Sequence, residues 1–147
     1  MQHDDAIVDL CLALFAEDPG PRTMVREEVL RTLDRLRREP VRGMAVVLEL
    51  DGLIVGYALL ISFWSNELAG ELCTVDELYV RPSHRNRGHG SALLCDLAAG
   101  QGPWPRVAIA IALEVTLGNT RAWNLYQRLG FKGGNRVMRK TLSLSST

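Results

Sequence analysis

The sequence predicts an α/β protein in which a mixed, mostly antiparallel sheet carries helices on both faces. Three observations support this prediction. Apolar residues follow a helical spacing up to about residue 38, and then form the short, valine-rich runs typical of strands. Asp51-Gly52 lies between two such runs and predicts a tight hairpin. From residue 72 onward strand and helix patterns alternate, which predicts one parallel pair of strands with a right-handed crossover.

The first half of the chain predicts two helices followed by three strands. A helical pattern starts at Ile7 and is ended by Asp18-Pro19-Gly20-Pro21. A second helix is predicted over residues 24–38, with Thr23 as its capping residue and acidic residues in its first turn. The predicted strands cover residues 44–50, 53–62 and 72–80, and residues 63–71 form a longer connection between the last two.

The second half predicts two helices and two further strands. A basic, glycine-containing loop over 83–90 precedes a helix over 91–99. Residues 107–115 are almost wholly apolar, as expected for a strand buried on both faces. The next helix opens at Gly118-Asn119, runs to Leu129 and is stopped by Gly130. Alternation over residues 136–144 predicts a last strand.

Composition and charge exclude several classes of protein. Apolar residues make up 47% of the 147-residue chain, which is enough to bury a core and excludes a mainly disordered protein. The 17 basic and 17 acidic residues balance, so charge predicts neither a nucleic-acid nor a membrane partner. No apolar run reaches the roughly 18 residues of a membrane span, and the N-terminus does not resemble a signal peptide. We therefore expect a single cytoplasmic domain over residues 1–147, with its three cysteines as free, buried thiols.

The loop between the third strand and the following helix has the composition of a phosphate-binding site. A helix start presents unpaired N–H groups and a partial positive charge. Gly88 and Gly90 lack a Cβ and would let a phosphate approach the backbone, and Arg85 and Arg87 add positive charge. Neither the Walker A pattern nor the dinucleotide pattern is present, since Leu93 stands where the latter needs its third glycine. An ordinary helix start after a flexible loop is the alternative interpretation.

Two motifs resemble those of one family. Arg85-x-x-Gly88-x-Gly90, after a strand ending in Leu78-Tyr79-Val80, resembles the acetyl-CoA signature of the Gcn5-related N-acetyltransferases (GNAT family). Residues 119–132, with an initial Asn119, a Tyr126 and a terminal Gly-Phe, are similar to another helix of that family. The resemblance covers residues 44–142 in the family's order of elements.

The resemblance implies acetyl-CoA as co-substrate, bound where two parallel strands, 72–80 and 107–115, splay apart. Backbone groups of Leu78 and Val80 would pair with the pantetheine arm like an added strand. The residues implied in cofactor binding are Leu78, Tyr79, Val80, Arg85, Asn86, Arg87, Gly88, His89, Gly90, Ser91, Asn119, Ala122 and Tyr126. Asn119 is also a good helix cap, and Ala122 is also a plausible packing residue. No metal is expected, because His84 and His89 have no third ligand beside them.

The resemblance also implies direct attack of a primary amine on the thioester within a ternary complex. Tyr126 would protonate the departing thiolate, since a phenol with an ordinary pKa carries its proton at neutral pH. Asp76 or Glu77, directly or through a water, would take the proton of the amine. Their adjacency places them on opposite faces of a regular strand, so only one can face the reaction. Each is equally well explained as a structural carboxylate.

The acceptor is expected to be a small amine or a peptide. Residues 43–80 contain six acidic and no basic residues, which suits a cationic amine beside a basic phosphate loop. Trp64 and Glu67, in the connection between the second and third strands, are candidate acceptor contacts. Alternatively, Trp64 is part of a hydrophobic cover over the core, and the carboxylates lie on a solvent-exposed surface.

The chain departs from the family pattern at its start. Family members begin with a strand, whereas here the helical pattern starts at Ile7 and leaves no room for one. The strand is absent, is supplied by another chain, or precedes the assigned start, and a homodimer is one way to cover such an open edge. A non-catalytic module that senses CoA or contacts a partner is the alternative to an enzyme.

Overall fold

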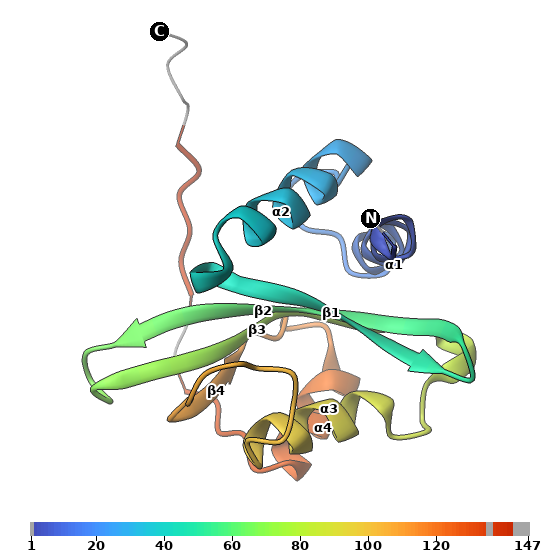
Figure 1. Ribbon diagram of the computed structural model, residues 1–147. Coiled ribbons are helices and arrows are strands. Elements are labelled where there is room, and N and C mark those ends of the chain that lie inside the picture. The colour runs from blue at the N-terminus through green and yellow to red at the C-terminus, as the bar shows by residue number, and fades with distance from the viewer. Residues whose placement is uncertain (1, 135–136, 143–147) are drawn as a thin grey trace, which may run out of the picture.

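A computed structural model describes residues 2–134 and 137–142 (Figure 1). Its sheet lies between two layers of helices. Helices α1 (Asp4–Glu17) and α2 (Arg26–Arg38) cover one face, and α3 (His89–Ala98) and α4 (Thr120–Arg128) cover the other (Figure 1). Two short 3₁₀ helices, η1 (Pro40–Arg42) and η2 (Pro82–His84), precede the first strand and follow the third.

The sheet has four strands among the described residues, in the order β1-β2-β3-β4. They are β1 (Gly43–Leu50), β2 (Leu53–Ser65), β3 (Gly70–Val80) and β4 (Ala110–Leu113). The first two pairings are antiparallel and the pairing of β3 with β4 is parallel, which confirms the predicted mixed sheet. The predicted hairpin is also confirmed: Asp51 and Gly52 adopt φ values of 51° and 79°, the left-handed pair that a tight hairpin needs.

Each face of the sheet has its own apolar core. On the α1/α2 face, buried residues of both helices pack against Tyr57, Leu59 and Tyr79 of the sheet. On the α3/α4 face, buried leucines of α3 pack against Ala58, Leu60, Cys73 and Val75. Side chains along each strand alternate between the two faces of the sheet, so each pair of helices packs against its own set of strand residues.

A β-bulge in β3 changes which face its side chains reach. Leu59 pairs with Glu77 and the next residue of β2, Leu60, pairs with Val75, so Asp76 is the extra, unpaired residue. As a result Glu77 and Tyr79 lie on the α1/α2 face, whereas Val75 lies on the α3/α4 face. Without the bulge, Val75 would share the face of Glu77 and Tyr79.

Three predicted boundaries differ from the structure. Strand β4 is much shorter than the predicted 107–115 and is only partly buried, because within residues 2–134 and 137–142 it pairs with β3 alone; Val107 is 87% exposed. Residues 63–65, predicted as connection, extend β2. The second helix starts at Arg26 without a side-chain cap, so Thr23 does not cap it.

The predicted last strand is not formed in its described part. Residues 137–142 are exposed and contain no strand; the remainder of the predicted 136–144 lies outside the described residues. The apolar side chains stand at Val137, Met138 and Leu142. In an extended chain the first two point to opposite sides, so no single face of the segment is apolar. Among the described residues no helix is both long and apolar enough to cross a membrane.

Candidate active site

The parallel strands β3 and β4 separate where the site is predicted. Their last paired residues are Val75 and Leu113. Strand β3 continues to Val80, and no strand of the described part of the chain lies beside it on that side, while the chain beyond β4 turns toward the start of α4 (Figure 1). We call the region between residues 76–80 of β3 and residues 114–119 the fork. The fork confirms the predicted splayed pair and leaves one backbone edge of β3 open to an added strand.

The loop that follows β3 brings a series of N–H groups to the start of α3. Asn86 and Gly88 adopt left-handed backbone, with φ of 60° and 81°. None of the N–H groups of residues 86–91 donates to a described backbone carbonyl, and the first bond of the helix runs from the Ala92 N–H to the Gly88 oxygen. A Cβ at Gly88 would meet open space, and one at Gly90 would lie 3.6 Å from the Leu78 side chain. The loop therefore offers donors and room for an anionic group.

Arg85, predicted as a phosphate-binding cation, is engaged in contacts within the protein. Its Nε donates to the Val80 carbonyl at 2.8 Å. Its Nη2 donates to both Glu17 carboxylate oxygens, at 3.0 and 2.7 Å. The guanidinium also lies 5.1 Å from the ring centre of Tyr79, whose hydroxyl donates to Glu17 at 2.9 Å. Arg87, by contrast, is exposed and pairs with no acidic residue among those described.

The two candidate bases lie in different surroundings. Glu77 accepts a hydrogen bond from the buried Tyr57 hydroxyl at 2.6 Å, and the Cys11 thiol lies 3.8 Å from the same oxygen. Burial raises the pKa of Glu77, although the Tyr57 and Cys11 hydrogen bonds act in the opposite direction. Asp76 is exposed at the bulge; partial desolvation and then the Glu114 carboxylate raise its pKa, and Arg139 opposes them. Asp76 alone of the two therefore has an exposed side chain, and it lies near Glu114 on the other side of the fork.

Tyr126 lies on α4, and Asn119 precedes that helix at the edge of the fork. The Tyr126 ring is half-buried against the α3/α4 core and packs edge-on against Phe131, with ring centres 5.8 Å apart. Burial raises its pKa, with Arg121 opposing, so the phenol keeps its proton at neutral pH. Asn119 caps α4, because its side chain accepts a hydrogen bond from the Ala122 N–H at 3.1 Å. The capping role is thus shown, and the cofactor contact of Asn119 stays a prediction.

The structure does not bring Trp64 and Glu67 to the fork. Trp64 pairs with Glu71 near the beginning of β3, and Glu67 lies in the exposed turn beyond it. Five residues of strand, roughly 17 Å, separate Glu71 from Asp76, where the fork begins. The acidic residues of 43–80 also do not form one surface, because Glu71 pairs with Arg106 at 2.6 Å while Glu77 bonds to Tyr57.

Sequence reasoning missed two contacts made by the residues that follow β4. The Thr116 hydroxyl donates to Asp18, just after α1, at 2.9 Å. Arg139 pairs with Glu114 at 2.5 Å. Glu17, Asp18 and Glu114 belong to no motif, and only the fold brings them near the loops after β3 and β4. No sequence pattern predicts that these three acidic residues lie near the site.

Cysteines and metal ligands take no part in the candidate site. Cys11 and Cys73 are buried and Cys95 is exposed, and all three are free, so the expectation of buried thiols is correct for two of them. Burial raises the pKa of both Cys11 and Cys73 to about 11, so neither is a thiolate at neutral pH. Across residues 2–134 and 137–142 no group of three or more metal-binding side chains comes together.

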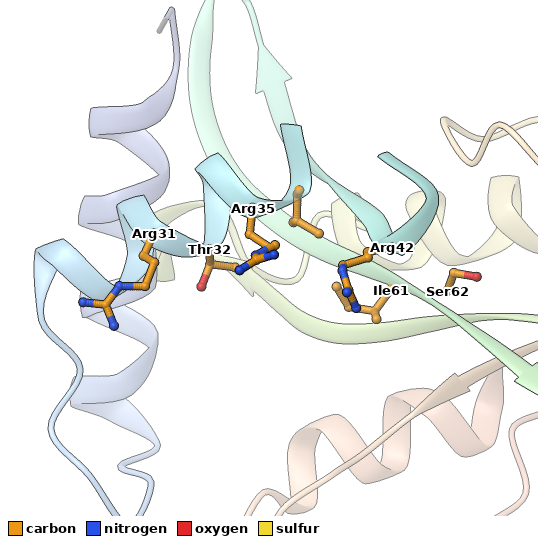
Figure 2. Close-up of a pocket in the computed structure, with 7 residues that line it drawn as sticks. Arg31, Thr32, Arg35, Arg42, Ile61 and Ser62 are labelled. Atoms are coloured by element: carbon orange, nitrogen blue, oxygen red, sulfur yellow. The ribbon is translucent and has the colours of Figure 1, made fainter. Parts of the chain in front are cut away.

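A groove of about 410 Å³ lies apart from the fork, between α2 and β2 (Figure 2). Three arginines, Arg31, Arg35 and Arg42, stand along it, and Leu36 and Ile61 form part of its apolar lining. Arg35 and Arg42 both pair with Glu39. None of the residues predicted for the active site lines this groove.

The family of the chain follows from its match to a family model. Residues 8–131 match the model described as the acetyltransferase (GNAT) family, and the chain belongs to this family. The resemblance seen in the two motifs is therefore confirmed.

The comparisons with individual proteins agree with this assignment. The chain is 35% identical over 101 residues to a mycothiol acetyltransferase of Kineococcus radiotolerans, covering 69% of this chain and 31% of that protein. The chain thus spans about a third of the length of this curated relative.

Solved structures share the fold at low sequence identity. An integron cassette protein from the mobile metagenome of Cole Harbour Salt Marsh has a TM-score of 0.78 at 23% identity, covering 98% of this chain and 88% of that chain. An aminoglycoside N-acetyltransferase in complex with CoA has a TM-score of 0.73 at 19% identity, covering 96% and 89%. These likenesses show the fold.

Proposed function

We propose that this chain transfers an acetyl group from acetyl-CoA to a primary amine. The observation that carries the proposal is the continuity of two features. The open edge of β3, residues 76–80, leads through η2 into a loop whose N–H groups, residues 86–91, donate to no backbone carbonyl among the described residues. An extended amide-containing arm fits the first feature, and a diphosphate fits the second. CoA contains both groups in that order, and the family assignment agrees.

The residues of the loop fit CoA in size and charge. Backbone groups of Leu78 and Val80 would bind the pantetheine arm, and the N–H groups of residues 86–91 would bind the diphosphate. Space beside Gly88 and Gly90 admits the phosphates, and the unpaired Arg87 supplies positive charge. Bound acetyl-CoA would supply an activated acetyl group as its thioester.

Protons would move through two residues near the fork. Asp76 would accept the proton of the attacking amine, because it is exposed at the bulge while Glu77 is engaged with Tyr57 and Cys11. A raised pKa brings a carboxylate closer to the range in which a general base is effective. Tyr126, whose pKa is raised by burial, would protonate the leaving thiolate.

A small amine is the acceptor that we favour. The exposed Asp76 carboxylate at the fork suits an ammonium group, and Glu114, which pairs with Arg139, lies near it. The names of the relatives differ: one is a mycothiol acetyltransferase, one an aminoglycoside N-acetyltransferase and one a ribosomal-protein-alanine N-acetyltransferase. An amine panel for this chain therefore includes a polyamine, an aminoglycoside, an amino sugar and a peptide with N-terminal alanine.

The binding of CoA is tested by calorimetric titration of acetyl-CoA into the native chain and two glycine variants. Gly88→Val should abolish binding, because its side chain occupies the phosphate approach. Gly52→Val is the matched control: Gly52 has φ of 79° against 81° at Gly88, and a Cβ meets open space at both. The two variants therefore carry similar backbone strain, and only the first should lose binding. A folded native chain that does not bind acetyl-CoA contradicts the proposal.

Turnover distinguishes an enzyme from a CoA-sensing module. Release of the CoA thiol is followed with a chromogenic disulfide while each amine of the panel is added. Thiol release that depends on one amine, with the acetylated product confirmed by mass spectrometry, supports the enzyme. Binding of acetyl-CoA without transfer to any amine of the panel favours the sensing module instead.

A further inference from the structure

The C-terminal end of α1 lies beside both loops that leave the fork. Glu17, the last residue of α1, contacts Arg85 and Tyr79 on the β3 side. Asp18, the next residue, accepts a hydrogen bond from Thr116 on the β4 side. Arg121 near the start of α4 also lowers the pKa of Glu17 through its charge. One short segment of the chain therefore bridges the two diverging strands.

Glu17 neutralises the arginine that the sequence assigns to the phosphate loop. The Arg85 side chain is 17% exposed, and its Nε and Nη2 donate to Val80 and Glu17. Burial alone would raise the pKa of Glu17, but hydrogen bonds from Arg85 and Tyr79 outweigh it and the pKa is lowered. Glu17 is therefore ionised at neutral pH, and its charge is balanced by that of Arg85.

We propose that Glu17 is a positioning residue for the candidate CoA-binding loop, and that it acts by holding Arg85 against the end of β3. This inference rests on the proposed function, because the loop is taken to bind the diphosphate of CoA. Arg85 then serves as a brace between α1 and the loop, and Arg87 with the backbone N–H groups of residues 86–91 receives the anion.

The conformation of the loop explains why a brace would be needed. The backbone of Asn86 is left-handed, a conformation that is uncommon for non-glycine residues although Asn adopts it more readily than most. The N–H groups of residues 86–91 must converge on one ligand, and a loop without its brace must be ordered during binding. Ordering even a few residues weakens affinity, so we expect Glu17→Gln to raise the Kd for acetyl-CoA about tenfold.

The experiment is a double-mutant cycle on Glu17 and Arg85, with the Kd for acetyl-CoA measured by calorimetry. Glu17→Gln, Arg85→Gln and the double variant should all bind with similarly raised Kd, because each removes the same brace. The exchanged pair, Glu17→Arg with Arg85→Glu, should recover most of the affinity although residue 85 is then negative. Asp9→Asn is the control: it removes one exposed negative charge from α1 and should bind like the native chain.

Each result decides between positioning and other roles. If Glu17→Gln binds acetyl-CoA with the same Kd as the control Asp9→Asn, the inference is overturned. A second result also overturns the inference: Arg85→Gln and the exchanged pair bind with a raised Kd, while Glu17→Gln binds as tightly as the native chain or more tightly. Arg85 would then be a direct phosphate ligand. Tyr79→Phe removes only the hydroxyl that orients Glu17; with an unchanged melting temperature, it should raise the Kd by a smaller factor than Glu17→Gln. A native chain that fails to bind acetyl-CoA overturns the proposed function, and this inference with it.

Discussion

Glu77 is the residue whose role changes most once its surroundings are known. The sequence shows an acidic residue next to Asp76 at the end of a strand, which is compatible with a base. The structure surrounds it with Tyr57 and Cys11 on the α1/α2 face. A strand pattern could not reveal this, because the bulge at Asp76 shifts the alternation of side chains and depends on pairing with β2.

The pKa of Glu77 makes a prediction about stability. Because burial raises this pKa in the folded state above its unfolded value, the ionised carboxylate disfavours folding. The penalty is absent below the unfolded pKa, near 4.3, and grows as pH rises through the folded pKa. Glu77→Gln should therefore gain stability relative to the native chain as pH is raised from 4.5 to 8.

Urea denaturation at several pH values measures this difference in the free energy of unfolding. Glu49→Gln, at an exposed position of β1, serves as the control and should keep the native pH dependence. The free energies of unfolding of Glu77→Gln and the native chain could instead differ by a constant amount from pH 4.5 to 8. The Glu77 carboxyl would then have the same pKa in the folded and unfolded states, and the prediction would be wrong.

At the scale of elements, the sequence predicts best where local chemistry decides the structure. The Asp51-Gly52 turn, the stop at Gly130 and the cap at Asn119 each depend on the backbone preferences of a few residues. Prediction fails where neighbours decide. The apolar run at 107–115 forms only the four residues of β4, because β3 is the one strand of the described chain that pairs with it. The extension of β2 through Trp64 depends likewise on its partner Glu71.

Helix α4 allows the two roles of Asn119 to be separated. Asn119→Ala removes the helix cap and should lower the free energy of unfolding by about 1 kcal/mol. Asn119→Asp keeps a capping oxygen and should retain most of the stability. If the side-chain amide also donates to the pantetheine arm, Asn119→Asp should still bind acetyl-CoA more weakly than the native chain. Thermal melts and calorimetry on the same samples measure both effects, and native affinity in Asn119→Asp would limit this residue to capping.

Across the whole molecule, the two helix layers contribute differently to the fork. The α1/α2 layer is anchored by buried residues in both helices, and its loop reaches the fork through Glu17 and Asp18. The α3/α4 layer supplies the groups that would meet the cofactor, namely the start of α3 and one face of α4. The family match covers both layers, but the contacts between α1 and the fork come only from the three-dimensional arrangement.

The stability of these layers should differ measurably in hydrogen exchange. No residue of α4 is fully buried, whereas α1 buries Ile7, Val8, Leu10 and Cys11. Helices with little buried apolar surface open at low free energy, so amides of α4 should exchange at least about tenfold faster than those of α1.

Acetyl-CoA should slow exchange in residues 86–91 and 119–126, because its binding fixes both sides of the fork. Amides of the β2–β3 turn, residues 66–69, lie at the opposite end of β3 from the fork and should not change. Equal protection of α4 and α1 in the free chain would contradict the first expectation, because α4 would then be stabilised by more than its buried apolar contacts. If acetyl-CoA also slows exchange in the turn, it stabilises the whole fold rather than a site at the fork.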